Sequence, residues 1–549
     1  MNSGTITSTG NKTTGYYLGN GTGSTIASGA KIDVTGNEAN GAYINTGSSL
    51  TYAGETKVTG DAAYGLIVDG SSTVNATGGK VIIGGTSGIN GSSSGANTNR
   101  GAAGLVVTSG STLSGNNLDV TADVSGENSV GVYSAGSLAI NSANVSAYDS
   151  AVNFFTNGGT LSIGNNGGTS TVLTGSGTNK GALMFYTPSG SILLNGTVNA
   201  TVQGSTDTLK RGTAFYYTGG GTLGTISSYT QLNPTTIASW ARNRFGNGTT
   251  STLGNLNLTM NPNSRLFLTE QVNIDLSNTS VTNLFSGLAS SERPNIPGPS
   301  SGYRTFMLYH SHLNVDKPVD LDNANDEYNL MEISSSSITN NNTITGTQAG
   351  QIAIAQANDT APKSVVTLTN NGTINVNGAY SIGMYGAGNG TTVTNNNDIV
   401  LNASNTTGIY VESNAKAINN GTIRTGASGL SNVNGVVLGG GSTLTNNGTI
   451  NISGNQSKGV LIKGGTIVNY GNITVSGTGS KETDSLNSTP TTKVLGSVTI
   501  TAPAGATTAT ITAGGVVVTP TVVNTTARNP ISVAADSIGL YVNTSSSIS

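Results

Sequence analysis

Several kinds of residue on which most folds and active sites depend are absent or rare in this chain. There is no cysteine among the 549 residues, which excludes disulfides and thiolate chemistry and suits a chain exported unfolded through an oxidising compartment. Only 9% of the residues are charged, 22 basic and 25 acidic. They form no basic stripe, so nucleic acid is not a predicted partner. No apolar run reaches 18 residues, so we expect no membrane-spanning helix.

Residues for catalysis are equally scarce. The alternating apolar segments are nearly free of Asp and Glu, whereas glycosidases and lyases need paired carboxylates or a base beside calcium. The glycine runs at 219–221 and 439–441 lack the lysine of a phosphate-binding loop. We therefore predict that the protein is not an enzyme and has no catalytic residue and no cofactor. A β-helical carbohydrate-active enzyme is the alternative.

The chain does contain a short phrase that recurs. Asn-Asn-Gly-Thr-Ile occurs at 370–374, 419–423 and 446–450, with degraded copies at 395–399 and 469–473. Steps of 25, 24, 27 and 23 residues separate the final isoleucines, Ile374, Ile399, Ile423, Ile450 and Ile473. Self-similarity at such a period is typical of stacked, solenoidal proteins.

A second phrase runs in phase with the first. A glycine followed by an apolar pair comes nine residues after the isoleucine, as at Gly383, Gly408 and Gly459, and looser copies extend from Gly15 to Gly539. The apolar residues between the phrases alternate with polar ones and are rich in Ile, Val and Thr, which predicts short strands joined by Asn-Gly turns. We predict an all-β right-handed parallel β-helix, a solenoid of about 15–16 coils, its hand following the general preference for right-handed crossovers.

Asparagines at equivalent turns of stacked coils are expected to form hydrogen-bonded ladders along the axis. This prediction covers Asn370, Asn371, Asn395, Asn396, Asn419, Asn420, Asn446 and Asn447. Solenoid coils are predicted for 1–224, 336–476 and, as a truncated coil, 531–549. An irregular lateral insertion at 225–335 and a Thr/Pro-rich protruding hairpin or loop at 477–530 interrupt them.

The segment 225–335 is the predicted contact region. It holds the only tryptophan and both histidines, and aromatic residues and arginine are enriched in recognition surfaces. Short helices are expected at 237–245 and 281–290. The candidate receptor or glycan contacts are Trp240, Arg242, Arg244, Phe245, Tyr303, Arg304, Tyr309, His310 and His312. The alternative is that the segment only decorates the rod.

We predict no metal site, although two features bear on one. His310 and His312 lie on the same side of a predicted strand, but no cysteine or third histidine completes a site. Asp320, Asp322 and Asp326 form a calcium candidate that lacks the glycine and the spaced final glutamate of an EF-hand.

The two phrases together resemble the passenger repeats of type V autotransporters, and are similar to those of the large fusobacterial outer-membrane adhesins. The likeness covers roughly 1–220 and 336–549. It implies display on the bacterial cell surface, secretion through a C-terminal barrel absent from this fragment, and a monomeric passenger. It also implies binding of a host cell-surface protein, such as an immune-cell receptor, of a host glycan, or of other bacteria in coaggregation. No binding residue is carried over, because the repeats match only scaffold positions.

Three interpretations remain open. The first is an adhesin that presents contact loops on a rod, and the second is a pure spacer whose binding tip lies outside this fragment. The third is the carbohydrate-active enzyme. No signal peptide or closing cap is visible, so the native protein is expected to continue in both directions.

Overall fold

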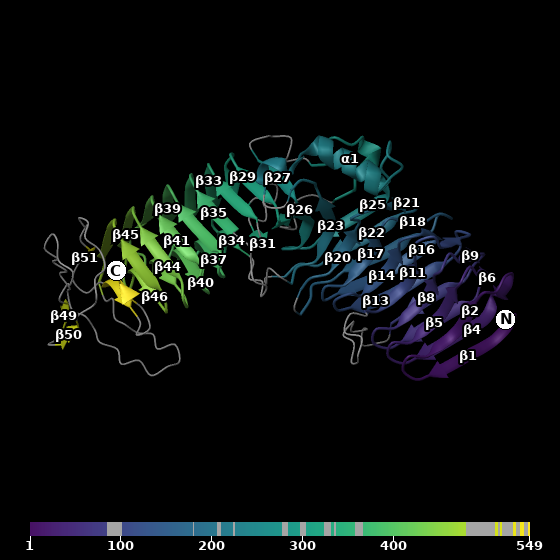
Figure 1. The fold of residues 1–549 in the computed structure, drawn as a ribbon. Helices are drawn as coiled ribbons and strands as arrows, with labels where there is room; N and C mark the ends of the chain where they lie inside the picture. The colour runs from purple at the N-terminus through teal and green to yellow at the C-terminus, as the bar shows by residue number, and fades with distance from the viewer. Residues whose placement is uncertain are drawn as a thin grey trace. The chain divides into compact units, whose positions relative to one another are not determined.

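The chain forms two compact units, each built on a parallel β-solenoid (Figure 1). Unit 1 comprises Met1–Gly219, Leu232–Glu270 and Ser280–Phe306, and unit 2 comprises Gly220–Gln231, Gln271–Thr279 and Met307–Ser549. The computed structural model describes residues 1–84, 101–178, 180–205, 210–222, 225–276, 284–296, 304–322, 331–333, 336–356 and 366–478, and the short C-terminal strands given below. The two units contain about 16 solenoid turns, which confirms the predicted all-β parallel solenoid. The hand of the helix stays a prediction.

Three sheets enclose the core of unit 1, and successive turns pair in parallel. The β1 sheet contains β1 (Ser3–Thr9), β4 (Gly29–Thr35), β7 (Glu55–Thr59), β10 (Lys80–Ile83), β13 (Asp119–Ser125), β16 (Ser142–Tyr148), β19 (Ser170–Thr174), β22 (Val198–Val202) and β25 (Leu256–Met260). The β2 sheet contains β2 (Thr14–Gly19), β5 (Asn40–Asn45), β8 (Tyr64–Val68), β11 (Ala103–Val107), β14 (Val130–Ser134), β17 (Val152–Thr156), β20 (Leu183–Tyr186), β23 (Thr213–Thr218) and β26 (Arg265–Glu270). The β3 sheet contains β3 (Ser24–Ile26), β6 (Ser49–Tyr52), β9 (Thr73–Ala76), β12 (Thr112–Ser114), β15 (Ser137–Ile140), β18 (Thr160–Ile163) and β21 (Ser191–Leu194).

Unit 2 has the same three-sided plan. The β27 sheet contains β27 (Val272–Asp275), β29 (His312–Val315), β32 (Ser337–Asn340), β35 (Val366–Asn370), β38 (Thr391–Asn395), β41 (Lys416–Asn419), β44 (Thr443–Asn446), β47 (Thr466–Asn469) and β53 (Ser547–Ile548). The β30 sheet contains β30 (Val319–Asp320), β33 (Thr343–Gly346), β36 (Thr373–Val376), β39 (Asp398–Leu401), β42 (Thr422–Thr425), β45 (Thr449–Ser453), β48 (Asn472–Ser476) and β51 (Ile531–Val533). The β31 sheet contains β31 (Met331–Ile333), β34 (Ile352–Gln356), β37 (Ile382–Ala387), β40 (Thr407–Glu412), β43 (Asn434–Leu438), β46 (Lys458–Ile462) and β52 (Ile538–Val542).

The remaining elements are few. The one α-helix of the described residues is α1 (Pro234–Arg244), and the 3-10 helices are η1 (Ile226–Ser228), η2 (Leu253–Asn255) and η4 (Ser290–Glu292). β24 (Thr230–Leu232) is the first strand of the β27 sheet, β28 (Arg304–Tyr309) pairs in parallel with β31, and each of the two contains a boundary between the units. Within the predicted hairpin at 477–530, β49 (Ile511–Ala513) pairs antiparallel with β50 (Val516–Val518). The segment 225–335 therefore contains solenoid strands as well as a helix.

The two sequence phrases recur in phase because the glycine of one phrase packs against the isoleucine of the other in the solenoid. The isoleucines that end the first phrase are register partners in consecutive turns, from Ile374 to Ile473, as predicted. A Cβ atom at Gly408 would lie 2.5 Å from the Gly435 carbonyl oxygen and 2.6 Å from Cγ2 of Ile423. Both approaches are shorter than atomic contact allows, so only glycine lets the turns stack at this corner.

Two asparagine ladders run along unit 2, as predicted. In the inner, buried ladder, Asn340, Asn370, Asn395, Asn419 and Asn446 each donate a side-chain N–H to the next turn at 2.7–2.8 Å, ending on Asn469. In the outer, exposed ladder, Asn371, Asn396, Asn420 and Asn447 each donate to the preceding turn at 2.8 Å, starting from Asn341. The two rows of amide dipoles therefore run in opposite directions, and every buried amide finds partners within its row.

Unit 1 has an aromatic column at the centre of its later turns. Phe154, Phe185, Phe215 and Phe267 are register partners in four consecutive strands of the β2 sheet, and all are fully buried. Adjacent ring centroids in the column lie 5.5–5.6 Å apart. Such spacing suits offset ring contacts, so the column supplies both apolar burial and aromatic attraction between turns.

Candidate functional site

Trp240 and Phe245, two predicted contact residues, lie in the core of unit 1, which corrects that prediction. Their side chains are 7% and 0% exposed. The Trp240 ring lies 5.8 Å from Phe215 and 5.4 Å from Tyr217, and Phe245 packs 5.3 Å from Phe185. Large aromatic rings that fill a core at this density cannot also serve as surface contacts.

The reason lies in the β3 sheet, whose last strand is β21. Helix α1 lies against β21, and residues that follow the helix form hydrogen bonds with the backbone of β21. Thr252 Oγ1 accepts the Leu194 N–H at 2.9 Å, and Asn255 donates to the Leu194 carbonyl at 2.6 Å. A helix that covers a sheet edge protects it from pairing with another chain, so α1 closes the solenoid core where the third sheet stops.

Helix α1 forms close to the predicted range 237–245, but it begins three residues earlier, at Pro234. Asn233 is its N-cap and accepts the backbone N–H groups of Thr235 and Thr236, while Pro234 occupies the first turn. Of the second helix predicted at 281–290, the structure describes residues 284–290; these are not α-helical, and 284–287 form a turn.

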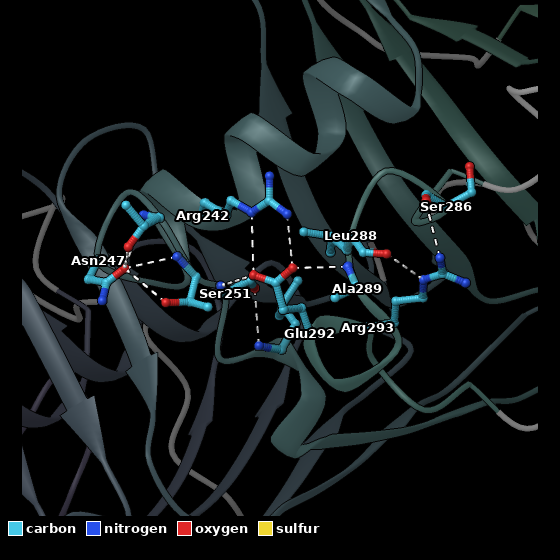
Figure 2. Close-up of polar contacts among 11 residues, drawn as sticks. Arg242, Asn247, Ser251, Ser286, Leu288, Ala289, Glu292 and Arg293 are labelled. Carbon is cyan, nitrogen blue, oxygen red and sulfur yellow. Dashed lines mark hydrogen bonds and ion pairs between the residues drawn. The ribbon is translucent and has the colours of Figure 1, made fainter.

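Arg242 and Arg244 hold α1 in place within unit 1, Arg242 through η4 and Arg244 through the residues that precede β21. Arg242 is ion-paired with the buried Glu292, with 2.9 Å between Nη2 and Oε2 and 3.3 Å between Nε and Oε1 (Figure 2). The same carboxylate accepts the backbone N–H groups of Ser251 and Ala289, each at 2.9 Å. The Arg242 hydrogen bond and these two N–H groups lower the pKa of Glu292 to about 2.

Arg244 makes a similar attachment with backbone partners. Its guanidinium donates to the Pro188 carbonyl at 2.9 Å and to the Gly190 carbonyl at 3.2 Å. Both arginines are half-buried. Their hydrogen-bonding groups are thus directed at this chain, which makes them poor candidates for binding a partner.

Of the other predicted contacts, Arg304 and Tyr309 belong to β28, His312 belongs to β29, and His310 lies between the two strands. Tyr303 lies outside the described residues, as does the side chain of Arg304. Tyr309 and His310 are half-buried, and their ring centroids are 3.8 Å apart. His312 Nδ1 lies 2.6 Å from Ser337 Oγ, and burial lowers the pKa of its imidazole. The rings of the sequence neighbours Tyr309 and His310 are in contact, and among the described residues no further metal-ligating side chain joins the two histidines.

Within the calcium candidate, both carboxylate oxygens of Asp322 already accept hydrogen bonds from this chain. Asp322 accepts the backbone N–H and the hydroxyl of Thr347, each at 2.6 Å, and the Gln351 amide at 2.8 Å. Calcium would require oxygen ligands where these donors point. Asp320 accepts the Asp322 N–H at 3.0 Å, and Asp326 lies outside the described residues. The described part of the chain contains no group of three or more metal-ligating side chains.

A surface that the sequence reasoning missed lies on the β2 sheet. One outward position of each strand carries a mainly aromatic or aliphatic side chain, in register from turn to turn. We call this row the aromatic stripe, formed by Tyr17, Tyr43, Ile67, Val106, Tyr133, Phe155 and Tyr186. Tyr17 is 59% exposed, and most of the other members are half-buried.

The stripe contains two groups of touching rings. Tyr17 and Tyr43 meet edge to face with centroids 5.7 Å apart. Tyr133, Phe155 and Tyr186 form a continuous row with spacings of 5.1 and 4.7 Å. Because alternate residues such as Phe154 point into the core, the strand period places an aromatic side chain on both faces of this sheet.

Polar groups line one margin of the stripe. Tyr43 donates to Asp69 at 2.9 Å, Thr108 donates to the same carboxylate at 2.6 Å, and Asn45 donates to the Tyr43 hydroxyl at 3.2 Å. Burial, with help from Asp69, raises the pKa of Tyr43. The nine strands of the β2 sheet contain one basic residue, Arg265, which is buried. The stripe is therefore an aromatic surface with neutral and acidic neighbours.

The signal for the stripe is present in the second sequence phrase. Its third position is the stripe position, as in Gly-Tyr-Tyr at 15–17, Gly-Ala-Tyr at 41–43 and Gly-Val-Tyr at 131–133. A two-residue period shows that neighbouring side chains face opposite ways, but it does not say which face is covered by other parts of the chain.

Comparison with protein-family models, with curated proteins and with solved structures finds no match for this chain. Among the described residues, no helix has the length and apolar character needed to cross a bilayer.

Proposed function

We propose that this protein is an adhesin, a solenoid displayed on a bacterial surface that binds a protein receptor or a glycan on another cell. The observation that carries the proposal is the aromatic stripe on the outer face of the β2 sheet. Aromatic side chains arranged in a row on a surface are a common basis of recognition, because they offer large contact area at low entropic cost. The proposal replaces the contact residues of α1 by those of the stripe.

Two features of the stripe favour binding over the alternatives. The nine strands of the β2 sheet, seven of which carry the stripe, contain a single carboxylate residue, Glu270 in β26, so these strands offer no pair of acids for glycoside chemistry. A spacer would be served by polar residues at these positions, because exposed aromatic rows risk association with other chains. The resemblance to autotransporter passengers, stated above from the repeats, supports the cell-surface setting.

The test removes the exposed rings while retaining strand-forming residues. We expect Tyr17→Thr combined with Tyr133→Thr and Phe155→Thr to lower the adherence of protein-coated beads to host cells by roughly tenfold or more, since anchor side chains contribute ~2 kcal/mol each. The matched control is Tyr380→Asn with Tyr470→Thr, which removes two aromatic side chains, 70% and 39% exposed, from elsewhere on the chain. Asn is used at position 380 because the backbone φ there is 59°, which asparagine tolerates and β-branched residues do not.

Circular dichroism and thermal melts must show that both variants keep the fold. Unchanged adherence of a folded stripe variant would contradict the proposal and favour the spacer interpretation. Pretreating the target cells with glycosidases or with protease then separates a glycan ligand from a protein receptor.

A further inference from the structure

Two tyrosines on consecutive turns of unit 2 share one carboxylate. Tyr385 in β37 and Tyr410 in β40 are register partners on the β31 sheet. Their ring centroids are 5.6 Å apart with 75° between the ring planes. The Tyr385 hydroxyl donates to Glu412 Oε1 at 2.5 Å, and the Tyr410 hydroxyl donates to Glu412 Oε2 at 2.9 Å. Both rings are half-buried, and both phenolic protons point at the same base.

This arrangement affects how easily the phenols lose an electron. Burial and the carboxylate raise the pKa of both hydroxyls, that of Tyr410 to about 12, so both are neutral phenols at physiological pH. A neutral phenol releases its proton when it is oxidised, and a hydrogen-bonded carboxylate is positioned to accept that proton. Oxidation at this pair is therefore assisted at both rings by Glu412.

A second pair in unit 1 offers a comparison within the same protein. Tyr17 and Tyr43 are also register partners, with centroids 5.7 Å apart and 74° between the ring planes. Here Tyr43 alone donates to a carboxylate, that of Asp69 at 2.9 Å, and the Tyr17 hydroxyl has no hydrogen-bond partner among the described residues. The two pairs match in ring geometry and differ in how many of the phenols face a base.

We propose that Tyr385 and Tyr410 are a site of oxidative modification at which two consecutive turns become joined by a dityrosine bond. The co-reactant is two equivalents of a one-electron oxidant. Each phenol gives up one electron and its hydroxyl proton, which passes through Glu412 to solvent. The two phenoxyl radicals couple through a ring carbon ortho to each oxygen. Each of these carbons then loses its hydrogen as the phenol hydroxyl is restored, so the product has two hydrogens fewer than the reactants.

The bond would close a loop of 25 residues, the separation of positions 385 and 410. A cross-link of this kind restricts the unfolded chain and thereby stabilises the folded solenoid, as a disulfide does in other proteins. In a chain without cysteine, it provides a covalent connection between turns. The inference does not depend on the proposed adhesin function.

The test oxidises the purified full chain with a photoexcited ruthenium complex and persulfate, followed by digestion and mass spectrometry. We expect a Tyr385–Tyr410 cross-linked peptide, lighter by two hydrogens than its two parts, to form several-fold faster than a Tyr17–Tyr43 peptide. Glu412→Gln should lower the rate of the first link several-fold, and Tyr385→Phe should abolish it.

The reciprocal control is Asp69→Asn, which should leave the Tyr385–Tyr410 rate unchanged. Thermal melts establish that each variant is folded, and Tyr385→Phe keeps the ring packing in any case. Equal rates at the two pairs, or an unchanged rate in folded Glu412→Gln, would overturn the role of the shared carboxylate. Oxidation of both residues without a link would overturn the proposed bond.

Discussion

Units 1 and 2 use one backbone plan but hold their turns together differently. In the later turns of unit 1, buried phenylalanines stack from strand to strand, and α1 adds Trp240 and Phe245 to them. In unit 2, buried asparagines donate from turn to turn in an unbroken row. The hydrophobic burial of the rings is non-directional, whereas an amide row is directional, and each member depends on the next. The comparison indicates that the two units should respond to different perturbations.

The largest expected effect comes from the aromatic column. Phe215 is fully buried and packs against Phe185, Phe267, Trp240 and Phe245. We expect Phe215→Ala to destabilise unit 1 by about 3–5 kcal/mol, since it removes a large buried ring and leaves a cavity. Hydrogen exchange measured by mass spectrometry should show faster exchange in unit 1 strands and unchanged exchange in β35–β45. Equal acceleration in both units would contradict the separation of the two cores.

The inner ladder should be the most sensitive feature of unit 2. Asn395→Ala removes the acceptor of Asn370 and the donor to Asn419, leaving buried amide groups unpaired at a cost of about 1–3 kcal/mol. The matched control is Asn396→Ala in the exposed outer ladder, where water replaces the lost partner and we expect less than ~1 kcal/mol. Denaturant titration of each variant measures the difference. Equal losses would mean that the inner ladder has no special role.

Acid should weaken unit 1 through Glu292. Its pKa is about 2 in the folded chain against an ordinary value of 4.5, so the folded state favours the carboxylate form. This contribution is fully present above about pH 4.5 and is lost as the pH falls towards about 2. Glu292→Gln should remove the contribution, so the variant should lose less stability than the parent over that interval. Melting temperatures measured from pH 6 to pH 2.5 test this, and parallel curves for the two proteins would contradict it.

The smallest expected effect is at the end of the outer ladder. Asn341 donates to Asp316 at 2.6 Å, so a carboxylate accepts from the last amide of the row. Asp316→Asn keeps the shape but loses the charge, and at this half-buried surface site we expect a loss of no more than ~1 kcal/mol. A urea titration at low and high salt checks the result, because the loss should shrink when salt screens the charge. A loss that is independent of salt would show that the charge does not contribute.

The sequence predicts the periodic parts of this fold well, since repetition itself carries the information. The isoleucine register and both asparagine ladders follow from the spacing of Asn-Asn-Gly-Thr-Ile. Each copy of this sequence occupies one solenoid turn, so equivalent residues of successive copies lie above one another. The phrase glycines follow in the same way, from the close approach of stacked turns at their corner.

The candidate site was much less predictable, because it depends on parts of the chain that do not repeat. Trp240 and Phe245 have the composition of an interface, but the same residue types fill a core when a helix closes it. Nothing in the sequence near α1 indicates that the β3 sheet ends at β21, whose last residue, Leu194, lies 40 residues before the first residue of α1, Pro234. The stripe residue Tyr133 belongs to a repeat position, and the alternation of side chains shows which residues share a face without showing whether that face is covered.

The in-register stacking of turns underlies the stripe, the ladders and the tyrosine pair, and cysteine cross-linking tests it directly in a chain that has no native cysteine. Thr369 and Thr394 are register partners on the β27 sheet, whereas Thr367 is offset from Thr394 by two residues. Partners in neighbouring strands lie ~4.8 Å apart, within disulfide range, and an offset of two residues exceeds it. We predict that the Thr369→Cys/Thr394→Cys chain oxidises readily to an internal disulfide and that the Thr367→Cys/Thr394→Cys chain does not. A disulfide in the offset pair but none in the partner pair would contradict the account.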